Sequence, residues 1–281
     1  MNDRNRPILR CHILDTGYCT AYERHLISSG RWKRVRCHSI AALLCHPTHG
    51  WFLWDTGYAP RIFEATQGFP FRAYRWATPI TAPQKLAVAY QLGRFGICQA
   101  DISRVLLSHF HADHIAGLLD FSSARLISTL EAWADVRHRS GFRALTRAFA
   151  PQLMPADFER RARLIESFSD AVVPPFGNAH DLFGDGSALL VRLPGHAAGQ
   201  VGMLAQTELG RLFFAADSCW TLASVQKRAM PNRITRFIAE DWVMLRETIH
   251  NLADFAQANP EVAIIPSHCP TAFRSFVQRE V

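Results

Sequence analysis

The sequence predicts a layered α/β fold, and two observations carry this prediction. Short apolar runs with β character recur through the chain, and segments with helical signals lie between them. Each run is followed by a histidine or an aspartate, so strand ends from separate parts of the chain are expected to meet at one sheet edge. With 281 residues, 48% of them hydrophobic, the chain can bury a substantial core without disulfides. We expect one domain over residues 1–281, or two tightly joined halves.

Five apolar runs are predicted as strands, each followed by a residue that can bind a metal or orient one that does. They are residues 51–54 before Asp55, 105–107 before His109, 189–193 before His196, 212–216 before Asp217, and 262–265 before His268. Asp185-Gly186 predicts a tight hairpin turn between residues 181–183 and 187–193.

Helices are expected to cover the outer faces of the sheets. One is predicted at residues 115–119, and a second begins near Ser128, where Ser128 and Glu131 have the spacing of a capping box. A third is predicted over residues 157–168 and a fourth over residues 239–258.

Residues 130–168 are predicted to form a helical insertion. Large apolar side chains such as Trp133 and Phe158 alternate there with arginines, of which Arg137, Arg143 and Arg147 could meet a carboxylate or a phosphate. An apolar inner face would suit a lid over an acyl chain or an aromatic ester. The same amphipathic pattern suits a contact between two copies of the chain, so a lid and a homodimer contact both remain open.

Charge and cysteine content limit the classes of partner. The formal net charge is +7, but no basic-aromatic repeat or RNA-binding module accompanies it, so we interpret it as solvated surface and expect no nucleic-acid partner. Seven cysteines without a CxxC pair indicate free thiols in a reducing compartment. Because no apolar run is long enough for a signal peptide or a membrane span, a cytoplasmic protein without a membrane partner is expected.

The strongest local signal is a cluster of metal-binding residue types. His109, His111, Asp113 and His114 lie within six consecutive positions, directly after a predicted strand. Imidazole and carboxylate ligands together suit zinc, iron or manganese. A solvated loop in a chain with thirteen histidines is the alternative. Further histidines and an aspartate after later strands favour a metal centre.

The ordered motifs resemble the metallo-β-lactamase fold superfamily over roughly residues 40–270. They are Asp55-Thr56-Gly57, His109-x-His111-x-Asp113-His114, Leu193-Pro194-Gly195-His196, Ala216-Asp217 and Pro266-Ser267-His268. The resemblance implies an αββα sandwich with a two-metal site. By the same resemblance, the first metal would be bound by His109, His111 and His196, the second by Asp113, His114 and His268, and both by the bridging Asp217. Zinc is expected as the metal, with iron or manganese as alternatives.

Such a site predicts hydrolysis. Two dications about 3.5–4 Å apart can hold a hydroxide between them and polarise a carbonyl or phosphoryl oxygen. Asp113 is expected to act also as a general acid that passes a proton to the departing alkoxide. Asp55 is expected to accept a hydrogen bond from a ligating histidine, and capping of the Thr56-Gly57 turn is the alternative.

Within the superfamily, the chain resembles the N-acyl-homoserine lactone lactonases. The resemblance rests on residues 55–58, 109–117 and 193–199, and it implies opening of a lactone ring or cleavage of a related small ester. That branch commonly has a tyrosine three residues after the bridging aspartate, where this chain has Trp220. An indole donates one hydrogen bond and accepts none, so Trp220 is either a weaker substrate donor or a packing residue.

Other functions remain as alternatives. A thioesterase of the glyoxalase II type usually has a C-terminal helical extension, whereas this chain ends thirteen residues after His268. A nucleic-acid phosphodiesterase normally adds a second domain, which is not visible here. A metal-binding sensor or effector on the same scaffold is the non-enzymatic alternative. Cys219 and Cys269 lie beside expected ligands, which leaves a thiolate ligand as a minor possibility.

Overall fold

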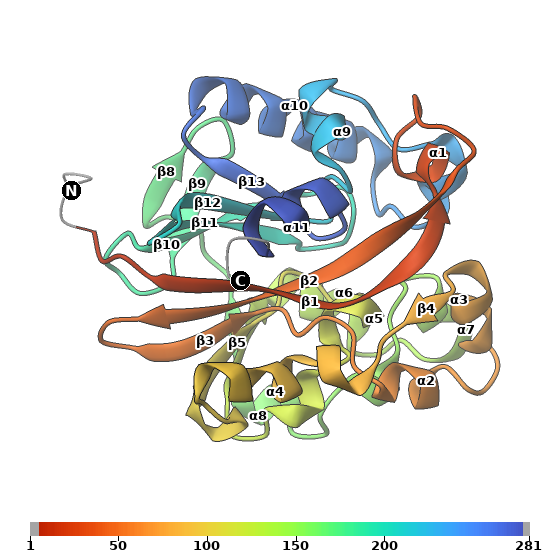
Figure 1. Cartoon of the computed structure of the whole chain (residues 1–281), viewed down its shortest axis with the longest axis horizontal. Coiled ribbons are helices and arrows are strands. Elements are labelled where there is room, and N and C mark those ends of the chain that lie inside the picture. Colours follow the sequence, from red (N-terminus) through yellow and green to blue (C-terminus); the bar gives the residue numbers. More distant parts are fainter. Residues whose placement is uncertain (1–5, 278–281) are drawn as a thin grey trace.

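The computed structural model describes residues 6–277 and shows two β-sheets packed face to face, with helices on both outer sides (Figure 1). The seven-stranded sheet has the order β4-β1-β2-β3-β5-β6-β7, and the six-stranded sheet has the order β13-β12-β11-β10-β9-β8. Both sheets mix parallel and antiparallel pairs. This arrangement confirms the predicted αββα sandwich.

All strands of the first sheet precede those of the second along the chain. The first sheet contains β1 (Arg10–Tyr22), β2 (Arg34–His46), β3 (Gly50–Trp54), β4 (Ile80–Thr81), β5 (Ile102–Leu106), β6 (Arg125–Thr129) and β7 (Ala162–Ile165). The second sheet contains β8 (Ala171–Val173), β9 (Gly177–Asp181), β10 (Ala188–Arg192), β11 (Val201–Thr207), β12 (Gly210–Ala216) and β13 (Ala263–Pro266).

Most helices are short, and α10 is the longest. The α-helices are α1 (Glu23–Leu26), α2 (Arg61–Ala65), α3 (Arg72–Ala77), α4 (Val88–Gln91), α5 (Ala112–Ile115), α6 (Leu130–Val136), α7 (Gly141–Leu145), α8 (Phe158–Arg161), α9 (Leu222–Gln226), α10 (Trp242–Ala258) and α11 (Pro270–Val277). Single turns of 3₁₀ helix occur at Gln84–Leu86, Leu92–Phe95, Gln99–Asp101, Leu118–Asp120, Pro151–Leu153 and Arg233–Phe237. None of the helices within residues 6–277 is long and apolar enough to span a membrane.

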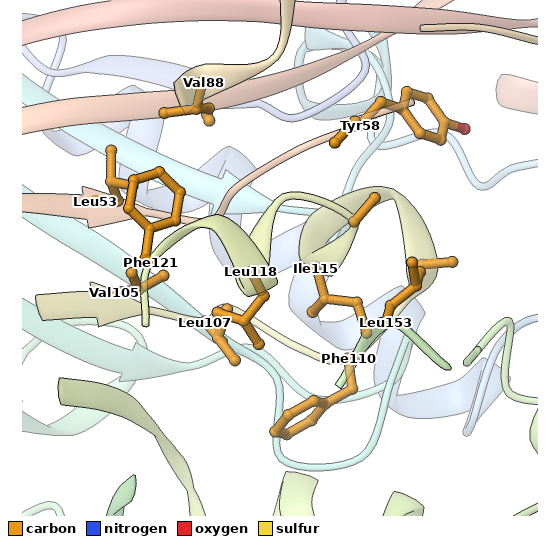
Figure 2. Close-up of a cluster of buried hydrophobic side chains, with 14 of the residues drawn as sticks. Leu53, Tyr58, Val88, Val105, Leu107, Phe110, Ile115, Leu118, Phe121 and Leu153 are labelled. Carbon is orange, nitrogen blue, oxygen red and sulfur yellow. The ribbon is translucent and has the colours of Figure 1, made fainter. Parts of the chain in front are cut away.

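Alternating side chains of the strands build three apolar layers. In β3, Phe52 and Trp54 pack between the two sheets, whereas Leu53 faces the helices that cover the first sheet. Figure 2 shows this outer layer, in which Leu53 and Val105 lie near residues from the helical segments. On the other side, α10 buries one face against β10, β11 and β12. The αββα order follows, because each sheet covers one face with the other sheet and one with helices.

The predicted strands are confirmed within one to three residues at each end. All five runs form strands, namely β3, β5, β10, β12 and β13. The long antiparallel pair of β1 and β2 was not predicted, because residues 10–46 mix basic and apolar side chains without a simple period. The Asp185-Gly186 turn lies within the connection from β9 to β10, which is longer than a tight two-residue hairpin.

Several helix predictions need correction. The helix predicted over residues 157–168 is wrong beyond Arg161, because residues 162–165 form β7 and pair in parallel with β6. The second helix begins one residue later than predicted, since the hydroxyl of Thr129, not Ser128, accepts the capping hydrogen bond from the Ala132 N–H. The helix predicted at residues 115–119 divides into α5 and a 3₁₀ turn. The fourth helix is confirmed as α10, which Asp241 caps.

The segment 130–168 is only partly helical and is anchored in the core. Trp133, Phe149, Leu153 and Phe158 are buried in the layer between the first sheet and its helices. Phe142 is 60% exposed on α7. The roles of lid and of dimer contact stay predictions.

Candidate metal centre

Five strand ends deliver the expected residues to one edge of the sandwich. β3 and β5 run parallel in the first sheet, and β12 and β13 run parallel in the second. β10 has the same direction as β12, because both are antiparallel to β11. The carboxyl ends of all five strands therefore lie at the same edge, followed in turn by Asp55, His109, His196, Asp217 and His268.

The structure brings the seven expected ligands together as two buried clusters. In each cluster, one ligand atom from every residue lies within 4.8 Å of the others. The members are His109, His111, His196 and Asp217 in one cluster, and Asp113, His114 and His268 in the other. The Asp217 carboxylate joins the two. Its Oδ2 lies 2.8 Å from Nε2 of His268 and 3.4 Å from Nε2 of His196.

Neighbouring groups hold three of the histidine rings by Nδ1. His114 Nδ1 lies 2.7 Å from Oδ2 of Asp55, and His268 Nδ1 lies 2.5 Å from the carbonyl oxygen of His38. His109 Nδ1 lies 3.0 Å from Oγ of Ser108. Because each Nδ1 has a partner outside the clusters, each Nε2 faces inward, where it can bind a metal once it carries no proton.

Asp55 makes a small buried network that fixes this geometry. Its Oδ1 accepts a hydrogen bond from the Ser108 N–H at 2.8 Å, and its Oδ2 accepts one from the Ser108 hydroxyl at 2.7 Å. Together with the hydrogen bond to His114, these bonds let the Asp55 carboxylate hold both ends of residues 108–114, the segment that carries the first four ligands. The structure therefore places Asp55 where it orients a histidine.

Buried ligand atoms without a hydrogen bond indicate that a metal fits the clusters. Among residues 6–277, Nε2 of His109, Nε2 of His114 and Oδ1 of Asp217 are buried without a hydrogen bond, although the last two lie 3.2 Å from each other. Burying such atoms unsatisfied costs about 1–3 kcal/mol each. Nitrogen and carboxylate donors around a gap are the ligand set of a divalent transition metal. The two clusters are consistent with a dinuclear site.

The backbone is strained at the strand ends. Asp55 has φ 55° and Ala216 has φ 47°, values that residues other than glycine rarely adopt. Gly195, next to His196, has φ 115°, and a Cβ there would lie 2.1 Å from the backbone N of Leu245 on α10. The start of α10 therefore packs closely against the residues that follow β10, and this contact holds His196 near the other ligands.

Burial and charge shift the ionisation of the clusters. Burial lowers the pKa of His111 to about 4 and the pKa of His196 to about 3, which favours the neutral, ligating form. Burial opposes the charged form of His268 as well, but the Asp217 carboxylate outweighs it and raises the pKa of His268 to about 9. Burial likewise opposes ionisation of Asp217, yet His268 and His114 hold its pKa well below the usual range.

A cavity of about 320 Å³ opens directly on the two clusters. Its floor contains members of both, namely His111, Asp113, His196, Asp217 and His268. Its walls are mainly apolar or aromatic and come from distant parts of the chain: Cys19, Ala21, His25, Leu26, Cys37, Tyr58, Tyr74, Ala77, Thr78, Ala148, Trp220, Ile234, Thr235 and Ile238. The arrangement can hold a small apolar molecule against the candidate metal residues.

The other residues considered from the sequence lie at varying distances from the cavity. Trp220 borders it, with its ring centroid 5.9 Å from that of His196. Arg147 forms ion pairs with Asp135 and Glu240, so it is not poised for a ligand. Cys219 belongs to neither cluster, and burial raises the pKa of its thiol, which disfavours a thiolate ligand.

Sequence reasoning missed several cavity residues. Tyr74 comes from α3, and Cys19 and Cys37 face each other across β1 and β2. His25 of α1 also lines the cavity. No local motif marks these positions, because they meet the metal clusters only through the pairing of β1 with β2 and β4.

Fold and site together indicate a metallo-hydrolase, and the two buried clusters are consistent with a dinuclear metal site. The model of the metallo-beta-lactamase superfamily matches residues 35–222, and the chain belongs to this superfamily.

Relatives and solved structures support the same placement. The chain is 27% identical over 241 residues to the N-acyl homoserine lactonase AttM of Azorhizobium caulinodans, covering 83% of this chain and 82% of that protein. A B. thuringiensis AiiA mutant with N-decanoyl-L-homoserine bound at its active site superposes with a TM-score of 0.72 at 17% identity, over 95% of this chain and 96% of that one. AidC, a dizinc quorum-quenching lactonase, superposes with a TM-score of 0.62 at 14% identity, over 95% of this chain and 89% of that one. These two structures show the fold alone.

Proposed function

We propose that the protein is a two-metal hydrolase that opens a lactone ring or cleaves a related small ester, with N-acyl homoserine lactones as the leading substrate class. The observation that carries this proposal is the position of the cavity. Both ligand clusters contribute to its floor, and most of its wall is apolar. An apolar wall suits an acyl chain, while the floor suits the polar ester group. The AttM relative, whose name states that it is a lactonase, supports the same substrate class.

The seven clustered residues would hold the two metals, with Asp217 between them. When bound, such metals activate a water molecule and polarise an acyl oxygen. Zinc is the proposed metal, because five of the seven ligands are imidazoles of the kind zinc prefers and the other two, Asp113 and the bridging Asp217, are carboxylates that it also accepts. Iron and manganese accept the same donor set.

Asp113 is the proposed proton carrier. Its carboxylate lines the cavity, and Oδ2 lies 3.4 Å from Nε2 of His268. In the reaction, water adds to the acyl carbon and the bond from that carbon to the ring oxygen breaks. Asp113 takes the proton that the water gives up and passes it to the departing oxygen, which becomes the hydroxyl of the product.

Hydrogen-bond donors for the substrate are proposed on two walls. Trp220 offers its indole N–H from the loop after β12. Tyr58 and Tyr74 offer phenol hydroxyls from the opposite side, and burial raises the pKa of both, so the hydroxyls stay protonated. These phenols can take over the donor role for which lactonases commonly use the tyrosine that Trp220 replaces.

Turnover of a small panel of substrates tests the proposal. Metal-loaded protein is assayed with an N-acyl homoserine lactone, an aryl ester, a thioester and a phosphodiester, and metal content is measured on the same samples. We expect the lactone to give the highest kcat/KM. Preference for the thioester or the phosphodiester would replace the proposed substrate class, and inactivity toward all four with two metals bound would favour a sensor or effector.

The role of Asp113 is tested by Asp113→Asn. We expect turnover to fall at least about a hundredfold, since general acid-base catalysis contributes 10²–10⁴-fold. Asp120→Asn is the matched control, because Asp120 is a nearby carboxylate that pairs with Arg61 instead of a ligand. Unchanged turnover in Asp113→Asn would exclude the proposed role.

The cellular location stays a proposal. All seven cysteines are free thiols in the structure, which supports work in a reducing compartment such as the cytoplasm.

A further inference from the structure

The mouth of the cavity is bordered by three segments that carry exposed aromatic and basic side chains. We call residues 24–37, 65–82 and 218–239 the rim. Each segment contributes side chains to the cavity wall, with His25 and Leu26 from the first, Tyr74, Ala77 and Thr78 from the second, and Ile234, Thr235 and Ile238 from the third. The helices α1 and α3 of the rim both lie toward the right side of Figure 1.

Backbone hydrogen bonds tie the three segments together around the mouth. Ser28 N donates to the Met230 carbonyl at 2.9 Å, and Asn232 N donates to the His25 carbonyl at 3.3 Å, so the first and third segments lie side by side. β4 of the second segment pairs with β1 at Tyr18 and Cys19, and Cys19 pairs in turn with Cys37 of the first segment. The rim is therefore one connected surface.

Large apolar side chains stand exposed on this surface. Trp32 is 67% exposed, Trp76 is 70% exposed and Phe237 is 87% exposed, and Ile234 beside Phe237 is 58% exposed. Trp32 is fixed in place by edge contacts to the rings of Tyr22 and His25. Several such side chains around the mouth of a cavity indicate a contact surface, because soluble proteins rarely expose large apolar patches that have no binding role.

The charge of the rim has one sign. The three segments contain no aspartate or glutamate, whereas their lysines and arginines are Arg24, Arg31, Lys33, Arg34, Arg36, Arg72, Arg75, Lys227, Arg228, Arg233 and Arg236. Arg228 pairs with Asp254. Of the adjoining acids, Glu23 accepts a hydrogen bond from the Arg31 N–H of the rim, Glu240 pairs with Arg147, and Glu64 precedes the second segment.

Exposed aromatic rings flanked by cations are the features of a surface that binds at a lipid-water interface. The sequence shows Arg31-Trp32-Lys33-Arg34, Arg75-Trp76 and Arg236-Phe237, each with its ring next to a cation. Tryptophan and phenylalanine enter the headgroup region, and lysine and arginine extend to the lipid phosphates and carboxylates.

We propose that the rim docks the protein on an anionic lipid surface, with the mouth of the cavity facing the lipid. An apolar ester dissolved in the bilayer then reaches the candidate metal residues without crossing water. No membrane partner was expected from the sequence, because that expectation rested on the lack of a membrane-spanning segment. A surface that docks on lipid needs no spanning segment.

A second copy of the chain is a poorer occupant. In a symmetric dimer the same patch meets itself, so the basic segments of the two copies would face one another and repel. A lipid surface with negative headgroups complements the patch instead.

Flotation with lipid vesicles tests the proposal on metal-loaded protein. Vesicles of phosphatidylcholine alone are compared with vesicles that contain about 30% phosphatidylserine, at low and high salt. We expect binding to the phosphatidylserine vesicles to be at least about tenfold stronger and to weaken with salt. Each lysine or arginine near such a surface strengthens binding about fivefold, so Arg31→Gln/Lys33→Gln/Arg34→Gln should weaken it about a hundredfold.

Two further variants separate the rim from general effects of charge. Trp32→Ala/Phe237→Ala should reduce vesicle binding about tenfold or more, while hydrolysis of a water-soluble substrate stays unchanged. Arg125→Gln/Arg160→Gln/Arg163→Gln is the matched control, because these arginines cluster at the start of β6, away from the cavity. It should change vesicle binding less than about twofold.

Three outcomes would overturn the proposal. The first is equal binding of the native protein to both kinds of vesicle, and the second is an equal loss in the control variant. The third is absence of vesicle binding together with evidence for another partner. That evidence is either a dimer that Trp32→Ala/Phe237→Ala dissociates or tight binding to a labelled oligonucleotide, and it would assign the rim to that partner.

Discussion

Asp55→Asn is the sharpest probe of how the metal ligands are oriented. Asp55 has φ 55°, and asparagine adopts this left-handed region readily, so the backbone is preserved. The amide oxygen can still accept from the Ser108 N–H, and the new NH₂ group can donate to the Ser108 hydroxyl. The NH₂ group then also faces Nδ1 of His114, where a carboxylate oxygen accepted a hydrogen bond at 2.7 Å.

Asp55→Asn should therefore weaken the binding of metal by one ligand, His114. Two donors cannot share a hydrogen bond, so His114 has to move its proton to Nε2, the atom that faces the second cluster. Loss of such an outer partner lowers metal affinity about 10–100-fold, which corresponds to about 1.4–2.7 kcal/mol. Zinc competition with a coloured chelator measures the affinity of each site, and we expect only the affinity of the site that contains His114 to change.

A remote pair of the same kind is the control. His46 is buried, and its Nε2 lies 2.8 Å from Oδ2 of Asp185, at the edge of the sheets where β3 and β10 begin, opposite the ligand edge. Asp185→Asn disturbs a histidine-carboxylate pair of similar length and should leave zinc affinity unchanged. If each site binds zinc as tightly in Asp55→Asn as in the native protein, the reasoning about ring orientation is refuted.

Three further predictions concern packing, substrate contact and pH. Gly195→Ala should lower the free energy of unfolding by about 2–4 kcal/mol because its Cβ meets the Leu245 backbone, whereas Gly210→Ala, with φ 103° but open space around it, should lower it less in urea titrations. Tyr74→Phe should lower kcat/KM about tenfold with metal content unchanged, while Tyr90→Phe, at an exposed position, should not; equal kinetics of both would remove Tyr74 from the site. Metal-free protein should lose stability as pH falls below 6.5, because His111 and His196, with pKa values of about 4 and about 3, stay neutral when folded but bind protons when unfolded. Each contributes a loss of about 2 kcal/mol between pH 7 and pH 5. His268 and His114, whose pKa values neighbouring carboxylates raise against the effect of burial, each offset less than about 1 kcal/mol of this loss, and urea midpoints that do not fall over this range would contradict the burial of the His111 and His196 rings.

The ligands were predictable because local patterns encode them. His109, His111, Asp113 and His114 lie in one turn, and each later ligand follows an apolar run that could only be a buried strand. Parallel strands end at one edge, so convergence followed without knowledge of the pairing order.

The cavity wall was not predictable in the same way. Tyr74 and Cys19 meet the ligands through the pairing of β4 with β1, which spans about sixty residues and has no local signal. The helix predicted over residues 157–168 failed for a related reason. Residues 162–165 have helix-forming arginine and leucine, but pairing with the edge of β6 outweighs this weak preference.

The rim also escaped the sequence interpretation. Arg31 to Arg36 were visible as a basic run, and basic runs are usually solvated surface. Their meaning changes only when the fold brings their segment to the same cavity as the segments that carry the exposed Trp76 and Phe237.

Anomalous X-ray scattering from crystals of the metal-loaded protein tests the central claim most directly. The account predicts two peaks about 3.5–4 Å apart, one inside the cluster of His109, His111 and His196 and the other inside the cluster of Asp113, His114 and His268, with Asp217 between them. The absorption edge identifies the metal at each position. A single peak, or metal bound outside these clusters, would contradict the two-metal site.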